Sequence, residues 1–407
     1  MSTAAIPSPA STAKLLKMAF DGCNLSSLRS AFLSQSQSGQ ERTAALLNLC
    51  TIEQLLGDVP AGLRRQAEAL RVHRLYRSSW QASPRALRVL AFLAPGDLSA
   101  NTPIDFLLQG TDVVLYSLYV VPGQPLPDPL PDHDIAIVAV GESDRARPIL
   151  QTIEQLIPSW PCPVLNRPER IVCLSREKMY RVLQGIPGLV APPTVRIERP
   201  SFEQLGRGVM PAGQFLAHGD FPLIVRTIDS HAGRGLAKIE TPPGVEAYLR
   251  DHPETAFFIS PYVDYRSADG LFRKFRLMWV DGRPYPCHMA IAEEWKVWYL
   301  NANMAASAAK RAEEAQFMAE FDADFGRRHA ATLAAIAARF GLEYVGIDCA
   351  ELPDGRLLVF EADVALVAHD MDPPEIYPYK GPQMRKLFAA FYDMLRGKSK
   401  SRSGAVQ

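Results

Sequence analysis

Three carboxylates near the C-terminus have side-chain types and spacing that could hold a metal ion. Residues 346–363 read as two β-rich runs on either side of Asp354-Gly355, a dipeptide typical of a tight turn. A two-residue turn at this point places Asp348 opposite Glu361. Asp363 shares their face because side chains alternate along a strand. The predicted hairpin therefore gathers three carboxylates on one side.

A carboxylate cluster of this kind needs a positive partner. Two unpaired carboxylates about 5 Å apart repel by roughly 3 kcal/mol at an effective dielectric of ~20, against a typical folding stability of about 5–15 kcal/mol. A cation, a proton or an arginine would remove this cost, and Mg²⁺ prefers such oxygen ligands and shares them with phosphates. Two alternatives are a solvated face whose charges never meet and a three-residue turn that separates the pair. The opposite face is expected to be apolar and consists of Val345, Ile347, Cys349, Leu358 and Phe360.

The composition is that of a globular protein with two or three domains. The chain has 407 residues, of which 47% are hydrophobic and 22% charged, and its 44 basic and 44 acidic residues cancel. A zero net charge gives no general attraction to nucleic acid or to anionic membranes. The six cysteines are scattered without a zinc spacing, which indicates free thiols in a reducing compartment. We find no signal-peptide pattern and no apolar run long enough for a membrane span, so we expect a cytoplasmic protein.

Changes in pattern divide the chain into four parts. Residues 1–85 carry helical periodicity, whereas residues 86–166 alternate short strands with helices, which indicates a small α/β domain. Residues 167–396 mix strands and helices without strict alternation, which indicates an α+β region of two lobes. Residues 397–407 read as a disordered basic tail. The predicted fold class is therefore α+β, with a helical N-terminal region and a small α/β domain ahead of the larger part.

Periodicity also predicts individual elements. In the N-terminal region, helices are expected over 41–56 and 62–77, a pair that resembles one tetratricopeptide unit although no repeat period is visible. A long Ala-rich helix is expected from about 305 to 340, with Gly341 as its natural end. In the α/β domain, strands are expected at 87–93, 113–119, 135–140 and 164–165, with a helix over 146–157.

A glycine-containing loop lies between two predicted strands, 223–228 and 236–239. The loop, Asp229-Ser-His-Ala-Gly-Arg-Gly235, has two glycines, which let backbone N–H groups approach an anion closely. No Gly-Lys-Ser/Thr and no helix follow, so it is neither a Walker A loop nor a dinucleotide fingerprint. The alternative is an ordinary hairpin turn.

Basic and polar residues elsewhere complete the candidate set. On the predicted strand 272–280, Lys274 and Arg276 share a face with apolar neighbours, so they need an anionic partner such as a phosphate, a carboxylate ligand or one of the acids above. Lys178 lies on a predicted helix, where a lone lysine is usually solvated. Asn301 could bind a metal or a substrate, or it could cap the helix that follows it.

Taken in order, these pieces resemble the ATP-grasp superfamily, in particular its RimK/glutathione-synthetase-like branch. The resemblance covers residues 86–395. Its order is a small α/β lobe, a helix with a lysine, a basic strand with a glycine loop, an apolar linker strand, a second basic strand and an acidic hairpin. The N-terminal helices, which are tetratricopeptide-like, lie outside the resemblance. The resemblance rests on this order of elements, because no single motif is decisive.

The resemblance implies ATP and Mg²⁺ as cofactors and a role for each candidate residue. The ATP-binding residues implied are Lys178, Arg226, Ser230, His231, Gly233, Arg234, Gly235, Ile259, Ser260, Tyr262 and Val263. Among these, Ile259–Val263 would line the adenine through the backbone. The Mg²⁺ ligands implied are Asp348, Glu361 and Asp363. The catalytic residues implied are Arg276, Lys274 and Asn301, with Arg276 touching the transferred phosphoryl group or the substrate carboxylate.

The chain departs from the family pattern at three places. Arg226 stands where lysine is usual, which keeps the charge and allows bidentate contact with phosphate. Asp363 stands where asparagine is usual and adds negative charge. Residues 364–370 replace the usual ending and offer His369 and Asp370 as candidate base or binding groups.

The resemblance implies an ATP-dependent carboxylate–amine or carboxylate–thiol ligase that forms an acyl phosphate and releases ADP and phosphate. Its substrates would be the carboxylate of an amino acid, a peptide or a small metabolite, and an amine acceptor. The N-terminal helices could bind a protein or peptide partner, and the chain could form a homodimer. The alternatives are a degenerate binding or scaffold protein of the same fold and a kinase that phosphorylates a small molecule without ligation.

Overall fold

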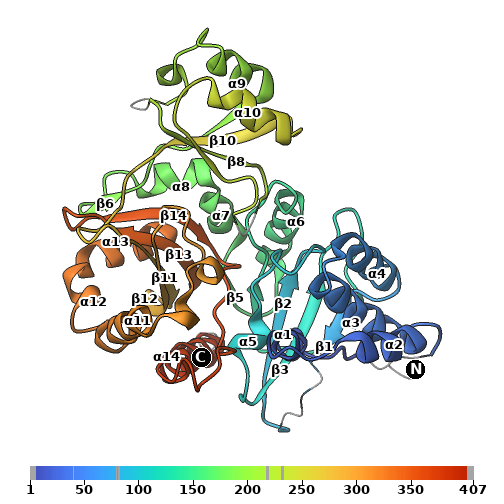
Figure 1. Ribbon diagram of the computed structural model, residues 1–407. Coiled ribbons are helices and arrows are strands. Elements are labelled where there is room, and N and C mark those ends of the chain that lie inside the picture. Colours follow the sequence, from blue (N-terminus) through green and yellow to red (C-terminus); the bar gives the residue numbers. More distant parts are fainter. Residues whose placement is uncertain are drawn as a thin grey trace.

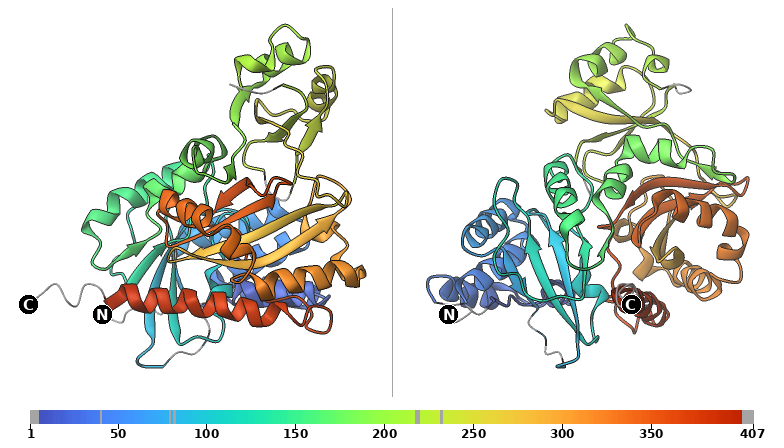
Figure 2. Two further views of the ribbon diagram at one scale, coloured as in Figure 1. Left: turned by 90° about the vertical axis from the view of Figure 1, so that its left-hand side faces the viewer. Right: turned by 180° about the vertical axis from the view of Figure 1, so that it is seen from behind.

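The chain folds into a helical region, a small α/β domain and two lobes that are each built around a sheet (Figure 1). The computed structural model describes residues 6–39, 41–78, 80, 83–216, 220–230 and 233–400. The predicted α+β class is confirmed. In the two further views, the smaller lobe projects from a body formed by the other parts (Figure 2). Among the described residues, no helix has both the length and the hydrophobicity to cross a bilayer.

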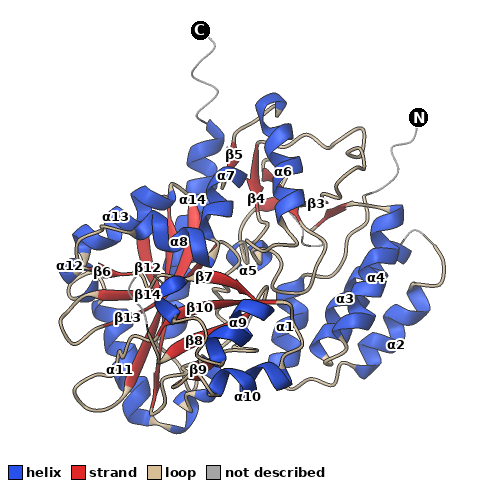
Figure 3. Ribbon diagram, turned by 90° about the horizontal axis from the view of Figure 1, so that it is seen from above, coloured by secondary structure: helices blue, strands red, loops and turns tan. Residues whose placement is uncertain are grey.

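Four helices form the N-terminal region: α1 (Thr12–Phe20), α2 (Ser26–Gln35), α3 (Arg42–Leu55) and α4 (Val59–Val72). Helix α4 begins where the side chain of Asp58 accepts a hydrogen bond from the N–H of Ala61 (2.9 Å). Helices α3 and α4 pack together, so the expected pair is present, but its second helix spans 59–72 rather than 62–77. Seen from above, α2, α3 and α4 lie together on one side of the molecule (Figure 3).

The α/β domain is a five-stranded sheet in the order β1-β3-β2-β4-β5. Its strands are β1 (Leu75–Arg77), β2 (Leu87–Leu93), β3 (Val113–Tyr119), β4 (Ile135–Val138) and β5 (Val164–Leu165). Strands β2 to β5 pair in parallel as expected, and their nearly continuous apolar runs suit a sheet that is covered on both faces. Strand β1 pairs antiparallel with β3, so the sheet of the α/β domain includes residues that precede the expected boundary at residue 85. The helices here are α5 (Ile104–Leu107), α6 (Arg147–Leu156) and the 3-10 helix η1 (Ile157–Ser159).

The smaller lobe holds the glycine loop. Its four-stranded sheet has the order β7-β10-β8-β9, with β7 (Val195–Glu198), β8 (Leu223–Thr227), β9 (Ala237–Ile239) and β10 (Ala256–Pro261). Strands β8 and β9 pair antiparallel, which confirms the predicted strand–loop–strand unit. Helices α9 (Arg199–Gly206), η3 (Ala212–Gln214) and α10 (Gly244–Asp251) complete the lobe. The chain enters it through α7 (Pro168–Ile171), η2 (Val172–Leu174) and α8 (Arg176–Leu183).

The larger lobe holds the basic strand and the acidic hairpin. Its five-stranded sheet has the order β12-β11-β13-β14-β6. The strands are β6 (Leu189–Val190), β11 (Phe272–Val280), β12 (Arg283–Ala292), β13 (Tyr344–Glu351) and β14 (Leu357–Asp363). Between β11 and β12, Asp281 and Gly282 adopt the left-handed conformations (φ 48° and 80°) that a two-residue hairpin turn requires. A short strap, residues 293–307, contains the 3-10 helices η4 (Tyr299–Asn301) and η5 (Met304–Ala306).

The helix expected from 305 to 340 is divided into three: α11 (Ala308–Glu320), α12 (Phe325–Arg328) and α13 (Ala330–Phe340). Gly341 ends α13 in a left-handed conformation (φ 59°), as expected. The last helix, α14 (Lys380–Ser399), shares a core with residues of β2 and β11, and so it joins the α/β domain to the larger lobe. Because α14 extends to Ser399, residues 397–399 are helical rather than part of the predicted disordered tail, and residues 401–407 lie outside the described part.

The turn of the acidic hairpin differs from the prediction. It contains three residues rather than two, because the N–H of Leu352 donates to the carbonyl of Arg356 (2.8 Å). Gly355 lies between them at φ 82°, where a glycine carries no steric cost. The longer turn shifts the pairing of the adjoining strand residues by one position.

A β-bulge cancels this shift farther along the hairpin. Phe360 is the extra residue, and beyond it Asp348 faces Glu361 as predicted. Leu358 lies before the bulge and faces Ala350, which places it on the carboxylate side rather than on the apolar face where it was expected. Asp348 and Glu361 therefore face each other as predicted, but only because the longer turn and the bulge cancel each other.

Asn166 joins the α/β domain to the larger lobe. Its Nδ2 donates to the carbonyl of Tyr344 (2.8 Å), and its Oδ1 accepts from the N–H of Tyr344 (2.9 Å). The N–H of Asn166 donates to Oε2 of Glu343 (2.7 Å). Asn166 is buried and left-handed (φ 52°), a conformation in which asparagine is enriched. A second link runs from Oγ1 of Thr102 to the carbonyl of Val364 (2.8 Å).

We predict that Asn166→Ala lowers the free energy of unfolding by about 2–3 kcal/mol, because it leaves the buried N–H and carbonyl of Tyr344 without these partners. Urea denaturation followed by circular dichroism measures the change. Asn166→Gly is the matched variant, since it also loses the amide but tolerates the positive φ. A loss under about 0.5 kcal/mol in both variants would contradict this role for Asn166.

Candidate active site

A large cavity lies where the three sheet-containing parts meet. Its volume is about 650 Å³, which is within the range of small-molecule sites. Strand β10 and the glycine loop line one side, β11, β13 and β14 another, and the loop after β4 a third. The smaller cavity, of about 170 Å³, lies between the N-terminal helices and the α/β sheet. In the smaller cavity, the Asp105 carboxylate accepts hydrogen bonds from Ser11 and Ala13. Its role there is structural, because these bonds hold the start of α1.

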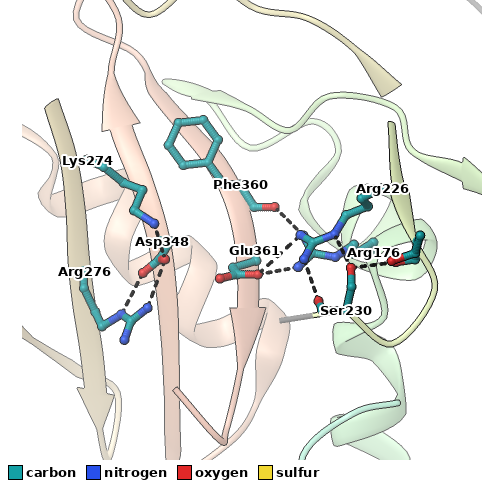
Figure 4. Close-up of polar contacts among 9 residues, drawn as sticks. Arg176, Arg226, Ser230, Lys274, Arg276, Asp348, Phe360 and Glu361 are labelled. Atoms are coloured by element: carbon teal, nitrogen blue, oxygen red, sulfur yellow. Dashed lines mark hydrogen bonds and ion pairs between the residues drawn. The ribbon is translucent and has the colours of Figure 1, made fainter. Parts of the chain in front are cut away.

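Arg276, Asp348 and Glu361 form a row across neighbouring strands on the wall of the larger cavity (Figure 4). Asp348 is only 1% exposed and is held by two cations. Its Oδ2 accepts from Nζ of Lys274 (2.9 Å) and from Nη2 of Arg276 (3.0 Å), and its Oδ1 accepts from Nε of Arg276 (2.8 Å). Burial alone would raise the pKa of Asp348, but Arg276 and Lys274 outweigh it and hold that pKa well below its usual range.

Glu361 is held from the other side of the cavity. Its Oε2 accepts from Arg176 of α8 and lies 3.8 Å from Nη1 of Arg226 on β8. Arg176 also donates to the carbonyl of Phe360 (3.2 Å), the bulge residue. Burial acts to raise the pKa of Glu361, but the combined attraction of Arg176, Arg226 and Lys274 outweighs it and the pKa is lowered. Both facing carboxylates are therefore ionised and paired.

Arg226 ties the glycine loop to this cluster. Its Nη2 donates to the carbonyl of Ser230 (2.6 Å), and its Nε lies 3.4 Å from the Ser230 hydroxyl oxygen. Burial, together with repulsion from Arg176, lowers the pKa of Arg226 to about 9. The guanidinium still carries its charge near neutral pH, so the predicted cation before the loop is present at the cavity wall.

The predicted metal site of three carboxylates is not assembled. Asp363 lines the cavity, but its Oδ1 accepts from the N–H groups of Ala365 (3.1 Å) and Glu142 (3.3 Å). Burial raises the pKa of Asp363 to about 6. Within the described part of the chain, no three His, Cys, Asp or Glu side chains gather as a metal-ligand set. The residues present therefore do not fit Mg²⁺ by themselves, because cations occupy Asp348 and Glu361.

The helical cation of the cavity is Arg176 rather than the predicted Lys178. Arg176 is the first residue of α8 and lines the cavity. Lys178 is half-buried two positions later, about 200° farther around the helix, so it faces another direction. Sequence alone marks both as basic residues at the start of one helix and does not say which of them faces the cavity.

The glycine loop contributes to the cavity only in part. Ser230 and Gly233 line it, whereas Arg234 is exposed to solvent and His231 lies outside the described residues. Gly235 has φ 63°, and a Cβ there would lie 2.7 Å from Oγ1 of Thr227, so close packing against β8 requires a glycine.

Of the four residues expected to bind the adenine, three line the cavity. Ser260, Tyr262 and Val263 line the cavity. Ile259 is fully buried in the core of the smaller lobe, because alternate residues of β10 face opposite sides of the sheet. The N–H of Tyr262 already donates to the carbonyl of Pro222 (2.9 Å).

Asn301 lines the cavity but uses its amide to hold the strap. Its Oδ1 accepts from the N–H of Trp298 (2.9 Å), and its Nδ2 donates to the carbonyl of Lys296 (3.1 Å). It closes the turn before it rather than capping the helix after it. The predicted catalytic role of Asn301 is therefore not supported by its contacts.

His369 and Asp370 do not join this wall. His369 packs against the rings of Phe20 and Phe106, with ring centroids 6.5 and 6.4 Å apart, and its Nδ1 accepts from the N–H of Met371 (3.2 Å). Burial lowers the pKa of His369. In this segment the cavity is lined by Ala365, Leu366 and Val367.

Two further cavity residues were not predicted. Lys296 on the strap donates from Nζ to the carbonyl of Leu236 (3.0 Å), so it bridges the larger lobe to the glycine loop. Glu142, in the loop after β4, is largely buried, and this burial outweighs the attraction of Arg147 and raises its pKa to about 7. Neither residue belongs to a motif, so only the packing of separate parts reveals them.

No protein-family model and no curated protein sequence matches this chain. Solved structures do match, among them a RimK-domain ATP-grasp protein from Sphaerobacter thermophilus DSM 20745, with 17% identity, a TM-score of 0.44 and coverage of 76% of this chain and 100% of that one. The D-alanine–D-alanine ligase from Bacillus anthracis complexed with ATP has 14% identity, a TM-score of 0.45 and coverage of 77% and 99%. The VanG D-Ala:D-Ser ligase from Enterococcus faecalis has 11% identity, a TM-score of 0.46 and coverage of 76% and 100%. This chain is thus similar in structure to an ATP-grasp protein and to two ligases, at identities that bear on the fold alone.

Proposed function

We propose that the larger cavity binds the phosphates of ATP and that the chain is an ATP-dependent carboxylate–amine ligase of the ATP-grasp type. One observation carries the proposal: four basic side chains from α8, β8 and β11 converge on two facing carboxylates at one wall. Four cations close together on one wall offer N–H groups that can donate to the oxygens of a polyanionic ligand as well as to the two carboxylates.

The surroundings of this wall suit a nucleotide. Ser230 and Gly233 belong to the glycine loop and line the same cavity, and backbone N–H groups beside glycines readily bind phosphate oxygens. Ser260, Tyr262 and Val263 line the neighbouring side, which supports a place for the adenine between the two lobes. The cavity is large enough to take a second, smaller substrate beside the phosphates.

In the proposed reaction, a substrate carboxylate attacks the γ-phosphorus of ATP, the bond to the bridging oxygen breaks and ADP leaves. The amine then attacks the acyl carbon, phosphate leaves, and the amine gives up a proton to solvent. Phosphoryl transfer depends chiefly on positioning and charge neutralisation, so it needs no side-chain nucleophile. Arg176, Arg226, Lys274 and Arg276 would neutralise charge on the transferred group.

A nucleotide-binding protein without turnover is the second candidate. It is favoured by the pairing of Asp348 and Glu361 with cations and by the hydrogen bonds that Asp363 accepts from backbone N–H groups. The N-terminal helices contribute no residue to the described lining of the cavity, which is consistent with a separate role in partner recognition. Binding of ATP without product formation would select this candidate.

Arg176→Met should weaken ATP binding by roughly 10- to 100-fold, because a charge-assisted contact with phosphate is lost. Adenosine affinity should change little, since Arg176 lies at the phosphate end. Lys178→Met, two residues along the same helix, is the matched control and should keep wild-type affinity for both ligands. Isothermal titration calorimetry with ATP and adenosine measures all four values. Equal losses in Arg176→Met and Lys178→Met would show that they act through folding.

The reaction class can be tested by trapping the intermediate. With ATP, a panel of amino acids and small carboxylates, and hydroxylamine in place of the amine, we expect a hydroxamate and an equal amount of ADP, because hydroxylamine attacks an acyl phosphate. Formation of AMP and pyrophosphate would move the protein to an adenylating class. ADP together with a stable phosphorylated product and no hydroxamate would identify a kinase.

A further inference from the structure

The N-terminal helices do not line the larger cavity themselves, but they hold a loop that does. This loop, residues 94–103, follows β2, and its Ser99 is a lining residue of the cavity. Residues 95–101 all belong to the described part of the chain, and none of them has a buried apolar side chain. Hydrogen bonds, rather than packing into a core, therefore keep this loop in place.

Two glutamines on α3 and α4 supply hydrogen bonds to this loop. Oε1 of Gln66 on α4 accepts from the N–H of Gly96 (2.8 Å), and Nε2 of Gln66 donates to the carbonyl of the same glycine (3.1 Å). Oε1 of Gln54 on α3 accepts from the N–H of Leu98 (3.0 Å). Gln66 is buried, so little water can replace its side chain as the partner of Gly96.

The two helices lie close together where they carry these glutamines. A Cβ at Gly62 of α4 would lie 2.7 Å from the carbonyl oxygen of Cys50 and 2.8 Å from Cγ of Gln54, so this approach requires a glycine. The helix pair also shares an apolar cluster with Tyr76 of β1 (Figure 1). The glutamines thus extend from helices that are themselves fixed to the α/β sheet.

The loop after β2 is joined to other segments that line the cavity. The carbonyl of Ala100 accepts from the N–H of Gly141 (2.9 Å) in the loop after β4. A Cβ at Gly141 would lie 2.9 Å from Cβ of Ala365, on the segment after β14, so the three segments meet at this glycine. Gly141 precedes Glu142, and both Glu142 and Ala365 line the cavity. A shift of residues 94–103 would therefore move other parts of the cavity wall as well.

We propose that α3 and α4 contribute to the active site indirectly, with Gln54 and Gln66 as positioning residues. They hold the loop after β2 so that Ser99 and the segments it meets form the wall that receives the carboxylate substrate. This wall is formed by the α/β domain and the segment after β14, whereas ATP is placed against the glycine loop, β10 and the basic side chains. The proposal rests on the proposed function and gives the N-terminal helices a part in binding the second substrate.

Hydrogen exchange followed by mass spectrometry tests the link between the loops without a substrate. Gln66→Met keeps the length of the side chain but removes both hydrogen bonds, so the amides of residues 139–142 should exchange about tenfold faster. Neither glutamine contacts these residues, so faster exchange there shows that the loop after β2 transmits the loss. Gln54→Met should act in the same direction and serves if Gln66→Met fails to fold. Unchanged exchange at 139–142 in the folded variants would overturn the proposal.

Kinetics and calorimetry test the effect on binding. Both glutamine variants should bind ATP with wild-type affinity, whereas KM for the carboxylate in the hydroxamate reaction should rise by about five- to tenfold with a smaller change in kcat. Glu68→Gln is the matched control, because Glu68 lies on α4 but pairs with Arg42 of α3 instead of with the loop. It should keep wild-type exchange and kinetics.

Two kinetic outcomes would contradict this role of the glutamines. An unchanged KM would show that the loop does not shape the substrate wall, and a loss of ATP affinity as large as the rise in KM would show a general effect on the fold. The proposed function would stand in both cases. If the wild-type protein binds no ATP, the proposed function is rejected together with the substrate wall, while the exchange experiment still decides whether the glutamines hold the loop.

Discussion

The central constraint on this structure is that two carboxylates lie side by side at a cavity wall, one of them fully buried and the other partly buried. Asp348 and Glu361 are ladder partners, and neither could stay ionised there without cations. The protein supplies these cations from α8, β8 and β11, which belong to different parts of the chain. These ion pairs therefore hold the two lobes and helix α8 together around one site.

The same charges connect the glycine loop to the acidic hairpin. Arg226 lies within 3.8 Å of Glu361 and donates a hydrogen bond to the backbone carbonyl of Ser230. A ligand that competes for the Arg226 guanidinium would therefore also affect the contact that holds the glycine loop. The α/β domain is attached to the same hairpin region independently, through Asn166 and Thr102. The smaller lobe has an apolar core of its own, whereas the α/β domain and the larger lobe also share apolar clusters, so these polar contacts add to packing between the parts.

Some predicted residues have structural uses that explain their type. Asn301 holds the strap with both ends of its amide, and Gly235 is required by packing against Thr227. His369 lies among aromatic rings next to α1, which shows how the N-terminal helices pack against the segment that follows β14. In each case the contacts of the residue point to the backbone or the core instead of a ligand.

Local pattern in the sequence was sufficient for strands β2 to β5 of the α/β domain, for β11 and for the strand–loop–strand unit, because alternation and turn residues act over short distances. It could not show that a three-residue turn and a bulge at Phe360 cancel each other, since both depend on how the hairpin packs. It led to Lys178 as the helical cation, and only the docking of α8 against β14 shows that Arg176 contacts Glu361 instead. The pairing of both carboxylates with cations was likewise decided by tertiary structure, because the four basic residues come from three elements that are brought together only by the fold.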